Sequence, residues 1–148
     1  MCPPSCPPSS AIHRLVPYAH VTDVERSLAF YEQLGLARGD TLTGSAGKLV
    51  WGSLHRGAAR LFLALADGPI AAGEQAVLFY FHTDDVRGLR EHLLACGVRD
   101  GGPFVGRPEP LHPRGVLFDL KFPHYMPAGE LRVHDPDGYV LLIGQPAS

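Results

Sequence analysis

The hydrophobic and polar positions of this chain follow a strand-then-helix pattern that occurs twice. Polar and apolar residues alternate over residues 14–21, which predicts a strand, and apolar residues then recur at helical spacing over 24–34. The same order returns as an apolar strand over 76–83 and a helix over 85–96. The pattern therefore predicts two related units of strand, turn and helix.

Individual residues repeat at a fixed interval as well. The pairs that lie 62 positions apart are Tyr18 and Tyr80, His20 and His82, Asp23 and Asp85, Val24 and Val86, and Gly35 and Gly97. Thr22 or Asp23 can cap the start of the first helix, and a glycine can take the left-handed backbone conformation that ends each helix. Because the strands of two such units are expected to face one shared cavity, we expect function where the halves meet.

Further strands are expected after each helix. In the first unit they cover 37–43, 48–54 and 60–66, and in the second unit they cover 116–122, 130–134 and 139–143. The last two strands flank Asp135-Pro136-Asp137-Gly138, in which Pro136 presets one dihedral angle and Gly138 takes the left-handed one. This sequence predicts a hairpin turn formed by the two aspartates. The prolines between residues 103 and 127 predict long loops that could cover a pocket.

The length of the chain limits the number of domains. A chain of 148 residues that is 45% hydrophobic can bury one ordinary core, so the two units are expected to be modules of a single domain over 11–148. Module one is placed at about 13–67 and module two at about 75–145. Residues 1–10 hold four prolines and three serines without apolar periodicity, which predicts a disordered tail.

Charge and hydropathy narrow the range of partners. A net charge of −2 without any dense Lys/Arg block argues against binding to nucleic acid or to an acidic membrane. No apolar run approaches the roughly 18 residues that a membrane span needs, and the start of the chain does not resemble a secretion signal. Three cysteines make no paired framework. We therefore expect a cytoplasmic protein whose partner is a small molecule.

Two motifs together carry a family resemblance. The sequence VTDVERSLAFYEQLG over residues 21–35 and the sequence DPDGY over 135–139 resemble the vicinal oxygen chelate superfamily. This superfamily includes glyoxalase I, extradiol dioxygenases, fosfomycin-resistance enzymes and bleomycin-resistance proteins. The resemblance covers almost everything from about residue 15 to residue 145. It implies an α+β fold of two βαβββ modules whose curled mixed sheet surrounds a shared cleft, commonly in a homodimer.

The resemblance also implies where a metal ion would bind. Enzymes of the superfamily usually hold one divalent ion with His, Glu or Gln side chains on the first and fourth strands of each module. In this chain those positions fall on Val16 and Phe62 in module one and on Leu78 and Leu142 in module two. None of these side chains offers a lone pair that could replace the water shell of a cation. We therefore expect neither a metal ion nor another cofactor.

The histidines offer an alternative metal site. His20 and His82 share the expected cavity-facing side of Val16 and Leu78 but lie four residues further along each strand, about 13 Å away. Three interpretations stay open for this pair: a shared metal ion, hydrogen bonding to a ligand in the pocket, or an exposed position at a strand end. His112, His124 and His134 lie in or beside the loops of module two and could approach the mouth of the cleft.

Aromatic residues suggest how a cleft without a metal ion would hold a planar ligand. Tyr18, Trp51, Phe62 and Tyr80 could project from strands into the cleft, where stacking on their rings would support binding. The alternative is that Phe62 and Trp51 are core residues. Arg60, on the same face as Phe62, and Asp119 are possible charged anchors. The expected ligand-binding residues are Tyr18, His20, Trp51, Arg60, Phe62, Tyr80, His82 and Leu142.

Three functions remain compatible with the sequence. The leading hypothesis is a metal-independent small-molecule-binding protein that sequesters an antibiotic or an aromatic metabolite. The second is a metal-dependent lyase, isomerase or dioxygenase of the same superfamily with an unconventional histidine site. The third is a dimeric accessory module whose cleft is vestigial. Nucleophile-elbow, phosphate-loop and dinucleotide-binding motifs are absent from the sequence, which argues against hydrolase and nucleotide-binding functions.

Overall fold

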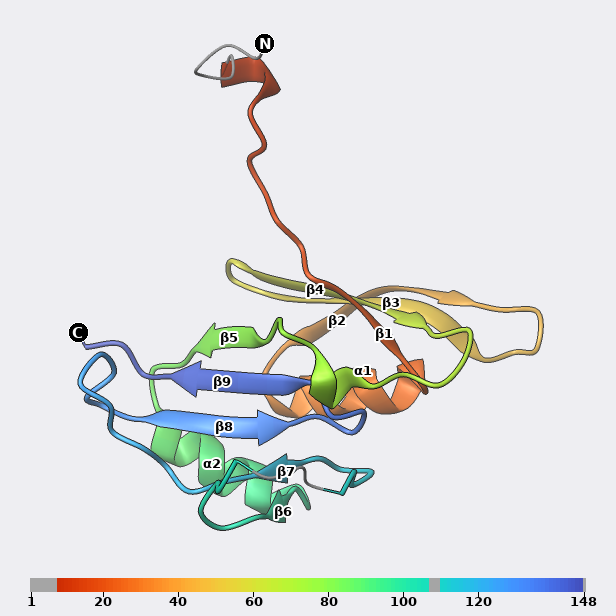
Figure 1. The fold of residues 1–148 in the computed structure, drawn as a ribbon. Coiled ribbons are helices and arrows are strands. Elements are labelled where there is room, and N and C mark those ends of the chain that lie inside the picture. Colours follow the sequence, from red (N-terminus) through yellow and green to blue (C-terminus); the bar gives the residue numbers. More distant parts are fainter. Residues whose placement is uncertain (1–7, 107–109, 148) are drawn as a thin grey trace.

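The structure, a computed structural model, describes residues 8–106 and 110–147. The chain folds into two sheets, and each sheet is formed by the strands of one module (Figure 1). The predicted α+β fold with two related modules is confirmed, although each module has a mixed sheet of its own. Residues 1–7 of the predicted tail lie outside the described residues, and Pro8–Ser10 form a short 3-10 turn, η1. None of the helices within the described residues is long and apolar enough to cross a membrane.

The first sheet has the strand order β1-β4-β3-β2. Its strands are β1 (Tyr18–Val21), β2 (Ala37–Thr43), β3 (Leu49–Arg56) and β4 (Ala59–Leu65). β1 runs parallel to β4, and the other pairs are antiparallel. The helix α1 (Val24–Gln33) makes the parallel crossover possible and packs on β3 and β4.

The second sheet has the order β5-β9-β8-β7-β6. Its strands are β5 (Phe79–His82), β6 (Arg99–Asp100), β7 (Val116–Leu117), β8 (Glu130–His134) and β9 (Val140–Gly144). The parallel pair of β5 with β9 repeats the parallel pair of β1 with β4. A 3-10 turn, η2 (Ala72–Glu74), precedes β5, and α2 (Val86–Ala95) follows it.

The two helices begin and end as the repeat predicts. Asp23 accepts a hydrogen bond from the backbone N–H of Arg26 at 3.0 Å, and Asp85 accepts one from Gly88 at 2.9 Å. Each aspartate thereby satisfies one of the backbone donors that a helix start leaves without a partner. Gly35 and Gly97 follow the helices with φ angles of 96° and 94°, in the left-handed region that favours glycine.

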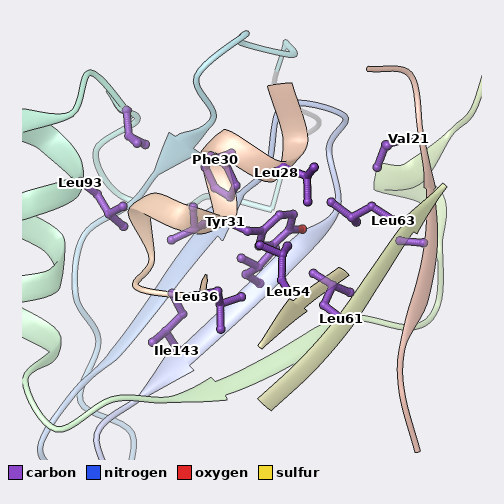
Figure 2. Close-up of a cluster of buried hydrophobic side chains, with 14 of the residues drawn as sticks. Val21, Leu28, Phe30, Tyr31, Leu36, Leu54, Leu61, Leu63, Leu93 and Ile143 are labelled. Atoms are coloured by element: carbon purple, nitrogen blue, oxygen red, sulfur yellow. The ribbon is translucent and has the colours of Figure 1, made fainter. Parts of the chain in front are cut away.

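One hydrophobic core joins both modules. Figure 2 shows Tyr31 of α1 close to Leu54 of the first sheet, and Leu36 close to Ile143 of the second. Leu28 and Tyr31 have no exposed surface, and Leu93 of α2 is equally buried. Full burial of such a side chain stabilises the fold by about 1.5–3 kcal/mol. Each sheet therefore has one face on the common core and one open face.

The hairpin between β8 and β9 connects module two to module one. The Asp137 carboxylate accepts hydrogen bonds from the backbone N–H and the hydroxyl of Thr22, and Arg26 approaches it at 3.4 Å. The Tyr139 hydroxyl donates to the backbone carbonyl of His20 at 2.7 Å. The prediction of turn-forming aspartates is confirmed, because the N–H of Gly138 bonds to the carbonyl of Asp135 at 2.9 Å. The sequence did not show that this turn also binds the other module.

Some predicted strands are shorter than expected. The strand predicted over 14–21 starts at Tyr18, because Pro17 has no N–H for the ladder and the preceding residues run away from the sheet (Figure 1). Alternation along a strand over 14–21 would place Leu15 on the same face as Ala19 and Val21, but Leu15 is 88% exposed. The strand predicted over 76–83 starts at Phe79, which pairs with Leu141 of β9.

The segment 116–122 also departs from its prediction. Only Val116–Leu117 form a strand, and Lys121 adds an isolated bridge to Glu130. The residues between them leave the ladder, although Phe118 still bonds to the backbone of Arg132. The strand β6 was not predicted, because its two residues carry no periodic pattern.

Candidate ligand-binding site

The residues predicted to bind a ligand lie on the open faces of the two sheets. On the first sheet, Ala19 and Val21 face the core and Tyr18 and His20 are exposed, as the strand alternation requires. Tyr80 and His82 alternate in the same way with Phe79 and Phe81 on β5. In Figure 1 the first sheet is seen nearly edge-on above α1, whereas the second is seen face-on in front of α2. The two open faces therefore point in different directions.

The open face of the first sheet carries a continuous group of aromatic rings, here called the aromatic patch, made of Tyr18, His20, Trp51 and Phe62. The Trp51 and Phe62 rings lie 5.2 Å apart between centroids, and Tyr18 meets Phe62 edge-on at 6.1 Å. His20 lies 5.7 Å from Tyr18. Trp51 and Phe62 are half-buried, and Tyr18 is 55% exposed. The patch offers flat apolar surface to a ligand or to another protein surface.

Arg60 lies beside this patch but is engaged by its own turn. Its guanidinium donates hydrogen bonds to the backbone carbonyls of Gly57 at 2.8 Å and Ala59 at 2.7 Å. These bonds close the connection between β3 and β4. In this structure the Arg60 guanidinium therefore stabilises its own turn, and these hydrogen bonds would compete with binding to a ligand.

The open face of the second sheet contains a groove formed by two cavities of about 340 Å³ and 270 Å³. Phe104 and Arg132 line both cavities, so the cavities adjoin at these two residues. The larger cavity is also lined by Leu111, His112, Val116, His134 and Val140. The smaller is also lined by Phe118, Asp119, Lys121, Tyr125, Glu130 and Leu142. Of the predicted site residues, only Leu142 lines this groove.

Two tyrosines hold a buried carboxylate at one end of the groove. The Tyr80 hydroxyl donates to Oε2 of Glu130 at 2.6 Å, and the Tyr125 hydroxyl donates to Oε1 at 3.3 Å. Glu130 is only 9% exposed, so these two bonds offset part of the cost of removing its charge from water. Burial and the bond to Glu130 raise the pKa of Tyr80 well above its usual range. Both phenols therefore remain protonated donors at neutral pH.

Arg132 occupies the centre of the groove. Its guanidinium carbon lies 3.8 Å from the centroid of the Phe104 ring, and its Nε donates to Nε2 of His134 at 3.0 Å. Phe104 also meets Phe118 and His134 edge-on. Burial, together with the charge of Arg132, lowers the pKa of His134 to about 4. The imidazole is thus neutral at pH 7 and can accept the bond from Arg132.

The metal positions implied by the superfamily resemblance do not fit a metal ion. Tyr18 pairs with Phe62 in the register of the first sheet, and Tyr80 pairs with Leu142 in the second. Val16 and Leu78 lie just before their strands and are as apolar as Phe62 and Leu142. Within residues 8–106 and 110–147, no group of three or more His, Cys, Asp or Glu residues could hold a metal ion.

The two histidines of the repeat, His20 and His82, lie in different depressions and do not form one site. His20 lies on β1 of the first sheet and lines a wide depression beside Tyr139 and Phe79. His82 lies on β5 of the second sheet, 5.7 Å from the Tyr80 ring, and lines a different depression.

Sequence reasoning missed Glu130, Arg132 and Phe104 of the groove, whereas His112 and His134, which it placed near the mouth of a cleft, do line it. Glu130, Arg132 and His134 alternate with the buried Leu131 and Val133, so the strand pattern alone carried a signal for an open polar face. Phe104 lies in a loop without periodicity, and no local pattern places it in the groove.

Comparison with known proteins gives the family. A profile described as the Glyoxalase/Bleomycin resistance protein/Dioxygenase superfamily matches residues 11–143. The chain belongs to this superfamily. The matched range contains both sheets and both open faces. No curated protein matches the chain in sequence.

Several solved structures share this fold. A bleomycin resistance determinant encoded on the transposon Tn5 has 18% identity and a TM-score of 0.66, with 93% of this chain and 100% of that chain covered. The bleomycin-binding protein of bleomycin-producing Streptomyces verticillus has 19% identity and a TM-score of 0.62, with coverages of 93% and 98%. An antibiotic-binding protein from Streptomyces sp. CB03234 has 23% identity and a TM-score of 0.63, with the same coverages.

Proposed function

We propose that this protein binds an organic small molecule without the help of a metal ion. The observation that carries the proposal is the apolar character of Val16, Phe62, Leu78 and Leu142, the positions at which superfamily enzymes are expected to hold their ion. Oxygen or nitrogen ligands are needed to replace the hydration shell of a cation, and these side chains have none. The bleomycin-binding protein and the antibiotic-binding protein that share this fold support a binding function.

The aromatic patch and the groove are the surfaces that would bind the ligand. The patch offers rings on which a planar molecule can stack, and the groove adds a few polar groups among apolar walls. A buried aromatic ring contributes on the order of a few kcal/mol through its area alone. Two or three such contacts would support micromolar binding. An antibiotic or an aromatic metabolite fits this chemistry.

We also propose that two copies pair so that the patch of one chain faces the groove of its partner. In a single chain these surfaces point in different directions (Figure 1), and both keep aromatic residues exposed. Tyr18 is 55% exposed and Tyr80 is 42% exposed. Exposed apolar surface of this kind usually marks a site of interaction with a partner. A twofold dimer would cover both surfaces on both chains and create two equivalent clefts.

The metal-free character is tested first. Freshly purified protein is analysed for Ni, Zn, Fe and Mn, and binding is measured with and without EDTA. Much less than one ion per chain and unchanged binding are expected. One ion per chain, together with loss of binding after EDTA treatment, would overturn the metal-free proposal.

Ligand binding is tested by thermal stabilisation. The protein is screened against bleomycin, other antibiotics and aromatic metabolites, because a ligand selective for the folded state raises Tm by mass action. Calorimetry with each compound that binds then compares Trp51→Ala with Leu15→Ala, a control that removes an exposed side chain outside the sheets. Trp51→Ala should weaken binding about tenfold or more, and the control should leave it unchanged. Equal affinities for both variants would contradict the placement of the ligand on the patch.

The shared cleft is tested by complementation. Trp51→Ala disables the patch and Tyr80→Ala disables the groove side, and each variant alone should bind poorly. If the cleft forms between chains, mixed dimers regain one cleft in which both surfaces are intact. If it forms within one chain, mixing restores no binding, and the paired arrangement is excluded.

A further inference from the structure

We infer that the groove of the second sheet selects ligands that carry a carboxylate or another oxyanion, which the guanidinium of Arg132 binds beside Phe104. This inference rests on the proposed binding function and adds the charge of the ligand to it. It follows from the hydrogen bonds and ion pairs among the described residues, which leave donors of Arg132 unused.

The guanidinium of Arg132 is held in place by its neighbours. The ring of Phe104 supports its flat face at 3.8 Å, and Nε is used in the bond to His134. Among the residues that the structure describes, the guanidinium makes no hydrogen bond other than that from Nε to Nε2 of His134, so its two terminal amino groups are available. A guanidinium fixed in this way can form two parallel hydrogen bonds to an oxyanion, a geometry that planar carboxylates match.

No acidic side chain of residues 8–106 and 110–147 neutralises this charge. The ion pairs within those residues involve Arg26, Arg38 and Arg90, and none involves Arg132. Arg132 is nonetheless half-buried, and burial lowers its pKa. A charge removed from water without a counterion is costly, whereas a bound anion would offset that cost.

The carboxylates that line the groove are already engaged. Both oxygens of Glu130 accept bonds from tyrosine hydroxyls. Asp135 accepts from Tyr31 with one oxygen and from two backbone N–H groups with the other. Asp119 lies 3.5 Å from Arg90. Of the acids that line the two cavities, this leaves Glu74, which is exposed on η2.

A second cation, Lys121, lines the smaller cavity beside Arg132, where Asp119 and Glu130 are the two acids. The ammonium group of Lys121 lies 5.9 Å from the centroid of Phe104, so two cations approach one ring. Lys121 is exposed and could move toward an anion bound at Arg132. The cavities, at about 340 Å³ and 270 Å³, lie near the lower end of the usual range for small-molecule sites. The ligand class is therefore a small acid with an aromatic or other flat apolar part.

The test compares acids with their neutral amides. Benzoate is paired with benzamide and 2-naphthoate with 2-naphthamide, and calorimetry measures each compound with the full-length protein. The acids should bind about tenfold or more tightly than the amides, because hydrogen bonds to charged groups contribute about 1.5–3 kcal/mol. In Arg132→Gln the preference for each acid over its amide should disappear. Arg132→Lys should retain part of it.

A measurement on the unaltered protein keeps the inference testable if Arg132→Gln does not fold. Raising the NaCl concentration should weaken the binding of the acids and leave that of the amides unchanged. Equal affinities for acids and amides, no binding of either acid, or an acid preference that survives in Arg132→Gln would overturn the inference. If neutral or cationic compounds of the antibiotic panel still bind, the proposed function stands without it. If no compound binds, the proposed function fails as well.

Discussion

The Tyr31 hydroxyl donates a 2.8 Å hydrogen bond to Oδ2 of Asp135, although the two residues lie 104 positions apart in the chain. Tyr31 belongs to α1 of module one, and Asp135 begins the hairpin of module two. Tyr31 is fully buried and Asp135 is 2% exposed. The bond thus joins the modules through the core. Because both groups are buried, neither can form a hydrogen bond with water in its place.

Replacing Tyr31 by Phe removes the hydroxyl and leaves a buried carboxylate with one partner fewer. The free energy of unfolding should fall by about 1–3 kcal/mol, which is the cost of a buried polar group that loses its hydrogen bond. Urea denaturation measures it. Tyr139→Phe is the matched control, because its hydroxyl bonds to a backbone carbonyl at an exposed site. An equal loss in both variants would contradict the importance of burial at Tyr31.

Two neighbouring residues should affect acid stability in opposite directions. The pKa of His134 is lowered from 6.5 to about 4, so its contribution to stability is present above pH 6.5 and is lost as the pH falls toward 4. Burial raises the pKa of Asp135 from 3.8 to about 6, so its contribution is present below pH 4 and is lost as the pH rises through 6.

The variant His134→Gln separates the two effects. It removes the titrating ring and keeps a hydrogen-bond acceptor for Arg132. Relative to the unaltered protein, the variant should therefore gain stability as the pH falls from 6.5 to about 4. The measurement is the difference between the two unfolding free energies across this range. A difference that does not change with pH would show that His134 does not titrate as described.

The caps of the two helices should contribute similarly, because the repeat builds them alike. Asp23→Ala and Asp85→Ala each remove an acceptor for a backbone N–H at the helix start. Each should lower the unfolding free energy by about 1 kcal/mol. Asp84→Ala, which changes an exposed neighbour of the second cap, is the control and should have little effect. A loss in only one of the two cap variants would mean that the helices are not equivalent.

Gly52 of β3 packs directly against the Leu28 side chain of α1. A Cβ atom at this position would lie 2.8 Å from Cδ1 of Leu28, which has no exposed surface. Gly52→Ala should therefore destabilise the protein by about 1–3 kcal/mol through overpacking. A Cβ atom at Gly68 would have nothing within 4 Å, so Gly68→Ala should change stability by less than about 0.5 kcal/mol. Thermal unfolding of both variants distinguishes a packing effect from a general cost of replacing glycine.

The fold could be predicted because its signals are local. The caps at Asp23 and Asp85 and the glycines that end both helices depend only on neighbouring residues, and all four occur where the repeat placed them. Strand ends were less predictable, since the start of a strand depends on the length of its partner. Tyr18 begins β1 because it pairs with Phe62, a residue far away in the sequence.

The binding surface was predicted only in part. The aromatic patch followed from alternation along single strands, and the structure places its members next to one another. The groove depends on the path of the loop that brings Phe104 to Arg132, and nothing in the sequence near Phe104 specifies that path. His134 was grouped with loop histidines, although it ends β8 directly beside a buried core residue.

The hairpin that fastens module two to module one also carries part of the groove wall, because His134 and Asp135 line the larger cavity. Displacing this turn would thus distort the cavity and detach α1 at the same time. The halves of this internally duplicated protein should therefore lose their structure together, in one cooperative transition, and a molecule held by the cavity would protect amide hydrogens in both.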